Sequence, residues 1–226
     1  MSEEARHLLL LGGGGHAAVV AESARAAGWS VTKYLDDDPG TEAAAGEIDL
    51  VRPGALGDLA DLADAPERAA VHAAVGDAGS RTKWLALAAG FGLEIATVID
   101  PSANVSPSAR IGEGVFIAPR AVVNARARLG RGVIINTFAI IEHDGDVGAF
   151  SHIAPRAVLC GGVRIGEASL VGAGAIVCPG VTIGPRTTVG AGAVVTTDIE
   201  GDCTAVGAPA RILDAARGQE GRRSGR

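Results

Sequence analysis

Between residues 99 and 195 the chain repeats one hydrophobic position every six residues. Every sixth residue from Ile99 to Val195 is Ile, Leu or Val, and the residue two places before each of these anchors is small or β-branched. A period of six fits neither an α-helix, with about 3.6 residues per turn, nor an ordinary strand, with a period of two. It is typical of a parallel β-helix, in which each hexapeptide supplies one short strand and one turn.

In the left-handed form of this fold, three hexads make one triangular coil, so a residue stacks on the one three hexads later. This geometry predicts that Arg126 lies beneath Asp144 and that Gly161 lies directly above His143. Two further columns are expected: Cys160 with Cys178, and Asp146 as a structural ion-pair partner between Arg128 and Arg164.

Residues 7 to about 95 follow a different pattern, which predicts the opening of a βαβ unit. A strand, a glycine turn, an amphipathic helix, a second strand and an acidic turn follow one another over 7–39. A further strand, a turn at 75–77 and a helix come later, in a half-size domain that suits one nucleotide better than a dinucleotide. The expected domains are a small α/β Rossmann-like domain (1–95), a left-handed β-helix (96–207), and a short C-terminal helix with a disordered tail (208–226).

The glycine turn is the candidate binding site of the first domain. Glycines at a helix N-terminus let the backbone approach a phosphate, and a carboxylate after the next strand can bind a ribose or base. Gly12-x-Gly14-x-x-Ala17 fits the dinucleotide fingerprint only loosely, and the alternative is a turn that merely packs a helix on a sheet. His7 and His72 are expected to be structural. The expected nucleotide-sugar ligands are Gly13, Gly14, Gly15, His16, Asp36, Asp37, Gly76 and Arg81.

Composition narrows the class of protein. The net charge of -6 and the pI of about 5.4 argue against a nucleic-acid partner. No apolar run reaches the roughly 18 residues of a membrane span, and the start of the chain does not resemble a signal peptide. Three cysteines, an odd number without a disulfide framework, fit a reducing cytoplasm.

The repeat becomes polar at one place, between residues 140 and 155. His143 stands between Glu142 and Asp144, and His152 follows nine residues later. Histidine is a suitable base near neutral pH, and a carboxylate bonded to one ring nitrogen fixes its tautomer. Because nine residues are half a coil, the two imidazoles face different sides of one chain and can meet only between neighbouring chains.

Several segments together resemble one family. GGGGHAAVV, LDDDP, GDAGSR, INTFAIIEHD, SHIAPRA and VGAPARIL, together with the hexads, cover nearly the whole chain. They resemble the sialic acid O-acetyltransferase family of sugar acyltransferases, and within it the nucleotide-amino-sugar N-acetyltransferases of the bacillosamine and perosamine type. The resemblance implies homotrimers that bind a nucleotide sugar in the first domain and acetyl-CoA between adjacent β-helices, without a metal.

The resemblance also implies residue roles. It assigns the general base to His143 and the orienting acid to Asp144, with Glu142 as the other neighbouring acid, while the residues leave open whether Asp144 pairs with His143 or with Arg126. His152 is assigned to acetyl-CoA, and Asn136 is a candidate for holding a sugar hydroxyl or the amine. Pantetheine is expected along Gly161, Ala173, Gly174 and Ala191, and a CoA phosphate at Arg211, whose alternative role is to cap a terminal helix.

The expected function is acetyl-CoA-dependent N-acetylation of a nucleotide-linked amino-deoxy sugar, by direct attack of the amine on the thioester. O-acetylation of a sugar or sialic acid is the main alternative, because nothing in the sequence names the acceptor atom. A metalloenzyme of the γ-carbonic anhydrase type would need three histidine ligands, and this repeat contains two at a different spacing. A non-catalytic scaffold would not require the histidine and its acids.

Overall fold

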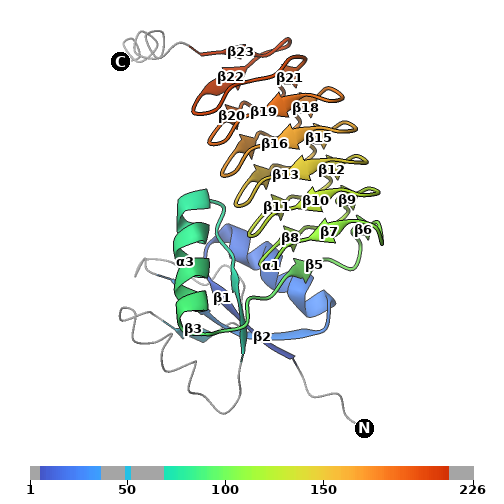
Figure 1. The fold of residues 1–226 in the computed structure, drawn as a ribbon. Coiled ribbons are helices and arrows are strands. Elements are labelled where there is room, and N and C mark those ends of the chain that lie inside the picture. The colour runs from blue at the N-terminus through green and yellow to red at the C-terminus, as the bar shows by residue number, and fades with distance from the viewer. Residues whose placement is uncertain (1–5, 37–48, 52–68, 214–226) are drawn as a thin grey trace, which may run out of the picture.

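The structure is a computed structural model that describes residues 6–36, 49–51 and 69–213. It consists of an α/β domain and a stack of short-stranded coils that rises from it (Figure 1). The α/β domain contains β1 (Arg6–Leu11), α1 (Gly15–Ala26), β2 (Trp29–Leu35), β3 (Asp49–Val51), β4 (Ala70–Ala73) and α3 (Ala78–Gly90). Its strands form a parallel sheet in the order β3-β2-β1-β4.

The four leucines of β1 are buried on both faces of this sheet. Leu8 and Leu10 pack in one cluster with the buried side of α1, whereas Leu9 and Leu11 pack in another with the buried side of α3. Side chains alternate along a strand, so a strand with a helix on each face has a continuous apolar sequence. The predicted small Rossmann-like domain is confirmed.

The coils that follow are built as the six-residue repeat predicts. Each strand before the last coil has two residues, and the second points inward, so that Ile117, Ile135 and Ile153 are fully buried. The expected left-handed hexapeptide β-helix is thereby confirmed. Its strands are β5 (Val98–Ile99), β6 (Asn104–Val105), β7 (Arg110–Ile111), β8 (Phe116–Ile117), β9 (Val122–Val123), β10 (Arg128–Leu129), β11 (Ile134–Ile135), β12 (Ile140–Ile141), β13 (Asp146–Val147), β14 (His152–Ile153), β15 (Val158–Leu159), β16 (Arg164–Ile165), β17 (Leu170–Val171), β18 (Ile176–Val177), β19 (Thr182–Ile183), β20 (Thr188–Val189), β21 (Val194–Val195), β22 (Thr204–Val206) and β23 (Arg211–Ile212).

Three sheets form the sides of the triangular stack. The first face is β23-β22-β20-β17-β14-β11-β8-β5, the second is β21-β18-β15-β12-β9-β6, and the third is β19-β16-β13-β10-β7. The chain runs from the first face to the second, to the third, and back to the first. Each turn therefore lies at a corner, which is named here by the two faces that it joins.

The register bears out the stacking but not every contact inferred from it. Arg128, Asp146 and Arg164 pair in adjacent strands of the third face, as predicted. No ion pair joins Asp146 to either arginine, although the structure describes all three residues. The expectation that Asp146 is an ion-pair partner is therefore wrong. Outward side chains in water gain little from pairing, and these remain solvated.

The C-terminal end of the β-helix also differs from expectation. A helix was expected from residue 208, but 207–210 form a turn, and β23 pairs antiparallel with β22. Residues 214–226 of the expected helix and tail lie outside the described residues. In the part of the chain that is described, no helix is long and apolar enough to cross a membrane.

The α/β domain packs on the first face of the β-helix. Phe116 and Ile134, which point outward from β8 and β11, are buried in the same cluster as Leu8 and α1. His72 of β4 is 1% exposed, donates from Nδ1 to the carbonyl oxygen of Ala96 at 2.9 Å, and packs against the ring of Phe116. His72 is thus a structural residue at the junction of the two domains, as expected.

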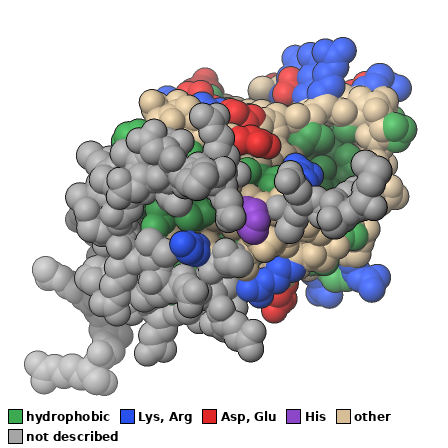
Figure 2. All heavy atoms as spheres, turned by 90° about the horizontal axis from the view of Figure 1, so that it is seen from below, with side chains coloured by type: hydrophobic (Ala, Val, Ile, Leu, Met, Phe, Trp, Pro, Cys, Tyr) green, Lys and Arg blue, Asp and Glu red, His purple; other side chains and the backbone are tan. Residues whose placement is uncertain are grey.

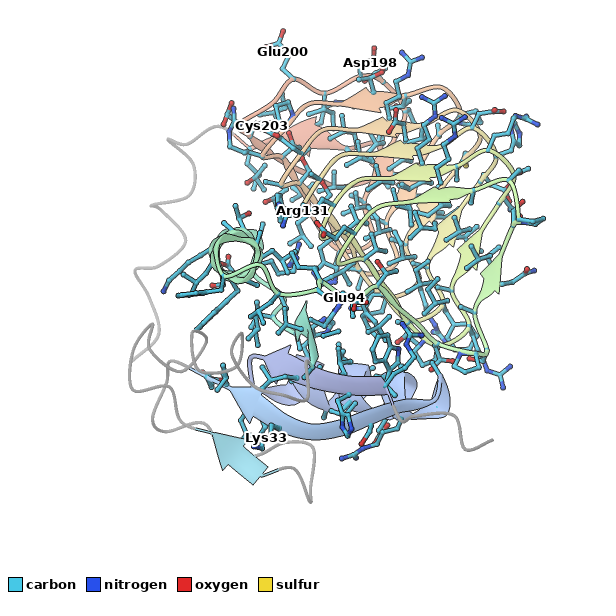
Figure 3. All side chains as sticks on the ribbon, turned by 60° about the horizontal axis from the view of Figure 1, so that its bottom comes forward. Lys33, Glu94, Arg131, Asp198, Glu200 and Cys203 are labelled. Carbon is cyan, nitrogen blue, oxygen red and sulfur yellow. The ribbon has the colours of Figure 1, made fainter. Side chains whose placement is uncertain are left out.

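Arg81 crosses the same junction, near the corner between the third and first faces. Arg81 belongs to α3, and its side chain is only 1% exposed, which is unusual for an arginine. Its guanidinium donates to main-chain carbonyls from both domains, and the acceptors are Val75, Gly76, Gly132, Phe150 and Ser151. This corrects the expectation that Arg81 binds substrate, because its guanidinium N–H groups already donate to carbonyls inside the protein. Arg131 adds a weaker link, because its Nη2 donates to Leu85 of α3 at 3.2 Å (Figure 3).

We expect Arg81→Ala to lower the free energy of unfolding by roughly 3–5 kcal/mol, because it leaves several buried carbonyls without donors. Chemical denaturation measures the change. Arg164→Ala, which removes an exposed arginine from β16, is the control and should stay within about 0.5 kcal/mol. Equal losses for the two variants would contradict the junction role of Arg81.

His72 should make stability depend on pH. Burial and the charge of Arg81 lower the pKa of His72 from 6.5 to about 4, against the opposing effect of its bond to Ala96. The unfolded chain therefore takes up this proton first, and stability falls as pH falls from about 6.5 to about 4. His72→Asn keeps a donor for Ala96 but does not titrate.

Denaturation between pH 8 and pH 4 should show a smaller loss for His72→Asn than for the wild type, by a few kcal/mol, on the order of 3. Near pH 8, well above the unfolded pKa of 6.5, the difference in unfolding free energy between the two proteins should no longer change with pH. Parallel curves over the whole range would show that His72 does not titrate in this way.

Candidate active site

His143 lies at the corner between the second and third faces, in the turn from β12 to β13. Its Nδ1 is 2.8 Å from Oδ2 of Asp144. An ionised carboxylate only accepts hydrogen bonds, so Nδ1 must carry the ring proton and donate it. The lone pair of Nε2 is then free to take a proton, as a general base requires.

Asp144 has a second partner one coil below, at the same corner. Nε and Nη2 of Arg126 donate to its Oδ1 and Oδ2 at 2.7 and 2.8 Å. Asp144 therefore pairs with both His143 and Arg126, which the sequence had left open. The Arg126 guanidinium and the His143 ring hold the pKa of Asp144 well below its usual range, so this carboxylate stays ionised at neutral pH.

Gly161 lies directly over the ring of His143, as predicted. A Cβ atom at this position would stand 2.6 Å from Nε2 of His143, so any other residue would displace the ring from this position. Its neighbours Cys160 and Gly162 donate their N–H groups to the carbonyls of Val177 and His143. The N–H of Gly161 has no acceptor in the described parts of the chain.

Two other polar residues at this corner, Glu142 and Cys160, do not bond the His143 ring. Oε2 of Glu142 accepts from the backbone N–H of His143 at 3.3 Å, so Glu142 contacts the main chain and not the ring. Burial, with the nearby Cys178 and Glu142, raises the pKa of the Cys160 thiol. Cys160 therefore stays protonated near neutral pH and is a poor nucleophile.

His152 belongs to a different part of the molecule. It points outward from β14 on the first face, and its Nε2 is 3.0 Å from Nδ2 of Asn136. The amide must donate in this pair, which leaves the ring proton on Nδ1. The carbonyl of Gly76 bonds the ring and raises its pKa, but burial and the charge of Arg81 dominate and lower the pKa of His152 to about 4. This histidine is neutral under ordinary conditions.

His16 completes this first-face cluster from the α/β domain. Its ring centroid lies 6.3 Å from that of His152 and 5.5 Å from that of Phe116. Burial and the neighbouring His152 lower the pKa of His16 to about 3. Its Nε2 is buried without a hydrogen-bond partner in the structure as described. No group of three or more His, Cys, Asp or Glu in the described residues could hold a metal ion.

The glycine turn before α1 has one closed side and one open side. Gly13 donates its N–H to Oδ2 of Asp36 at 2.8 Å, and a Cβ at Gly13 would lie 2.1 Å from the ring of Tyr34. Gly14 and Gly15 have nothing within 4 Å of such a Cβ, and no side chain caps the helix. The helix N-terminus therefore opens to solvent and suits an anion. Asp37 lies outside the described residues.

The residues expected along pantetheine do not share one corner. Gly161 lies between the second and third faces, whereas Ala173, Gly174 and Ala191 are exposed at the corner between the first and second faces. Within one chain they cannot line a single groove, which corrects that part of the expectation. Arg211 is exposed on β23, and its Nη1 donates to the carbonyl of Ala210 at 2.8 Å, so it does not cap a helix.

Two aromatic residues shape the sites but were not foreseen. The ring of Tyr34 fixes how closely the glycine turn can pack, and Phe116 packs against both His16 and His72. Each leaves a signal in the sequence. Tyr34 is the single tyrosine of the chain, and Phe116 replaces an aliphatic residue at an outward strand position.

Comparison with known proteins agrees with both the α/β domain and the β-helix. Residues 7–87 match the family model "PglD N-terminal domain", and residues 162–197 match "Bacterial transferase hexapeptide (six repeats)". No curated protein matches the sequence significantly.

Solved structures are similar over nearly the full length of the chain. PerB from Caulobacter crescentus, in complex with CoA and GDP-perosamine, is 39% identical with a TM-score of 0.86, over 95% of this chain and 100% of its own. The acetyltransferase domain of PglB from Neisseria gonorrhoeae, in complex with acetyl coenzyme A, is 38% identical with a TM-score of 0.85, over 93% and 100%.

WeeI from Acinetobacter baumannii, at 24% identity and a TM-score of 0.81 over 92% of this chain and 100% of its own, shares the fold. Structures of the Caulobacter enzyme, described there as perosamine N-acetyltransferase, also include variants with one histidine replaced by asparagine or alanine. The family follows from the fold together with the identity of 39% and 38% to PerB and to the PglB acetyltransferase domain over their full lengths. The chain belongs to the hexapeptide-repeat family of nucleotide-amino-sugar N-acetyltransferases.

Proposed function

We infer that this protein transfers an acetyl group from acetyl-CoA to the amino group of a nucleotide-linked amino-deoxy sugar. The observation that carries this inference is the corner arrangement of His143. Its Nδ1 is bonded to Asp144 and its Nε2 is free beneath Gly161. The 39% identity to a GDP-perosamine N-acetyltransferase supports the substrate class. Acetyl-CoA as co-substrate and three free cysteines support a cytoplasmic location.

The chemistry needs one base and one oxyanion donor. The sugar amine attacks the thioester carbonyl directly, and Nε2 of His143 accepts the proton that the amine loses. The N–H of Gly161, which has no acceptor among the described residues, is the proposed donor to the oxyanion of the tetrahedral intermediate. Collapse of this intermediate breaks the C–S bond, and the imidazolium can return the proton to the departing thiolate. The raised pKa keeps the Cys160 thiol protonated, so this cysteine is a poor nucleophile and the proposed mechanism has no acyl-enzyme.

The nucleotide sugar is proposed to bind at the α/β domain. The open N-terminus of α1 at Gly14 and Gly15 suits the diphosphate. Figure 2 shows a histidine side chain at the surface seen from below, with basic and acidic side chains on the same face. The sugar end would reach the cluster of His16, Asn136 and His152, where His16 Nε2 offers an unused polar atom.

The active site is proposed to lie between two chains of a homotrimer. The sugar-binding cluster is on the first face, whereas His143 is at the corner between the second and third faces. In a cyclic trimer, different sides of two neighbouring prisms meet, so both halves would face one groove. The exposed Leu170 on the first face and Ile176 on the second are apolar surface that such contacts would cover. His152, Ala173, Gly174 and Ala191 of one chain would then line acetyl-CoA opposite Gly161 of the next, and Arg211 would remain available for a CoA phosphate.

His143→Ala should lower kcat by roughly 10²–10⁴ while the KM for acetyl-CoA stays near its wild-type value, because the base acts in the chemical step. Release of the CoA thiol with GDP-, UDP- and dTDP-linked amino sugars measures turnover. Asp146→Ala, an exposed unpaired acid three residues away, is the control and should remain active. No turnover by the wild-type protein with any of these sugars would overturn the proposed function. Normal turnover by His143→Ala would overturn only the assignment of the base.

Mixing two inactive chains tests the site between subunits. Gly14→Trp should block the anion site, and the backbone there accepts a side chain, since φ is −76° and nothing lies within 4 Å of a Cβ at this position. Co-expression of Gly14→Trp with His143→Ala should restore about a quarter of the wild-type activity. A working interface needs an intact anion site from a His143→Ala chain and an intact His143 from a Gly14→Trp chain, and random assembly gives this combination at about one interface in four. Light scattering on the mixed sample should give three times the 22.5 kDa chain mass. A trimer that shows no recovery would mean that each chain holds a complete site.

A further inference from the structure

Arg126 and Asp144 form a closely matched ion pair beside the proposed base. Both occupy left-handed backbone positions at one corner, with φ of 61° and 60°. The guanidinium binds both carboxylate oxygens, and Oδ2, which accepts from Nη2 of Arg126, also accepts from Nδ1 of His143. The backbone N–H of Arg126 donates in turn to Oγ of Ser108, one coil further down, at 3.1 Å. A hydrogen-bonded column therefore ends on the ring of His143.

Stability alone does not account for this pair. The side chains of Arg126 and Asp144 are 64% and 46% exposed, and ion pairs so open to water contribute little to folding. The pair does have a geometric effect. A carboxylate held by one partner can rotate about its side-chain torsions, whereas a two-point bond to a planar guanidinium fixes the position of both oxygens. Fixing Oδ2 fixes where the proton on Nδ1 must point.

We propose that Arg126 is a positioning residue for acetyl transfer, acting through Asp144 to hold the tautomer and orientation of His143. This inference rests on the function proposed above and adds a residue to its site. Arg126 does not touch the ring, so its effect must pass through the carboxylate. The other charged group near the ring, Glu142, bonds the backbone of His143 and cannot replace Asp144 at Nδ1.

The chain contains an internal control for this idea. Arg186 and Asp202 form the same two-point pair at another corner, with distances of 2.6 and 2.8 Å and φ of 52° and 58°. Arg186 also lies 3.6 Å from Glu167. No histidine contacts either member of this pair, since no such bond is present among the described residues. The two pairs share their backbone and charge, and only the pair of Arg126 leads to an imidazole.

Turnover tests the proposal through a double-mutant cycle. Arg126→Gln should lower kcat by about three- to ten-fold with both KM values unchanged, and Arg126→Lys, which keeps the charge but loses the planar fork, should recover only part of it. In an Asp144→Ala background, Arg126→Gln should have no further effect, because its connection to His143 is already gone. Arg186→Gln should leave kcat at the wild-type value. Equal effects of the two glutamine variants, or losses that multiply with Asp144→Ala, would overturn the proposal.

A second measurement does not depend on activity. The ring ¹⁵N chemical shifts of His143 at pH 8 report which nitrogen carries the proton. We expect the Nδ1–H form in the wild type and in Arg186→Gln, and a mixture of both tautomers in Arg126→Gln. An unchanged tautomer in Arg126→Gln would overturn the positioning role even if the enzyme is active. The expected shifts together with no turnover on any nucleotide amino sugar would instead reject the proposed function.

Discussion

Parallel main-chain hydrogen bonds hold each coil of the β-helix in register on the one below. Two of these bonds lie at the corner between the second and third faces, where His143 stands. The N–H of Asp144 donates to the carbonyl of Ala125, and the N–H of Gly162 donates to the carbonyl of His143. Because the ladder fixes the vertical neighbour of every residue, it decides which side chains of adjacent coils meet at a corner. It brings Arg126 beneath Asp144 and Gly161 above His143, and the bond between the adjacent residues His143 and Asp144 completes the arrangement.

The α/β domain is fixed to this scaffold through the first face. Arg81 bonds carbonyls of both domains, and one of its acceptors, Gly76, also bonds the ring of His152. The position of the α1 N-terminus relative to His152 and Asn136 is therefore set by buried contacts and not by a linker. A rigid junction of this kind is needed if a sugar bound in one domain is to present its amine at a groove formed by the other.

The repeat made much of this architecture predictable, because its period of six and the three hexads per coil of the left-handed fold together determine which residues stack. The positions of Gly161 over His143 and of Arg126 under Asp144 follow from these two features. Stacking did not predict that Asp146 forms no ion pair with Arg128 or Arg164, because it brings outward side chains near one another while water competes for them. Arg81 was misassigned for a different reason. An arginine in a helix after a glycine-containing turn suits a phosphate ligand, and only the packing of the second domain against α3 shows that it is buried. The segment after residue 208 has good helix formers, but the free edge of β22 offers hydrogen bonds that outweigh this weak preference.

The corners explain why polar chemistry occurs where it does in a chain of aliphatic hexads. Each turn from Gly114 to Gly192 contains a left-handed residue, which is unfavourable by roughly 1 kcal/mol for any residue other than glycine. At higher coils of the corner that holds Asp144, the chain uses Gly162 and Gly180. Arg126 and Asp144 accept this strain and pair across the coils, as Arg186 and Asp202 do at another corner. The same two-point ion pair therefore occurs at two corners of this protein. Its effect changes when the residue before the aspartate is a histidine, because the fixed carboxylate then fixes an imidazole as well. A structural contact of the fold thus becomes part of the proposed active site through a single side chain.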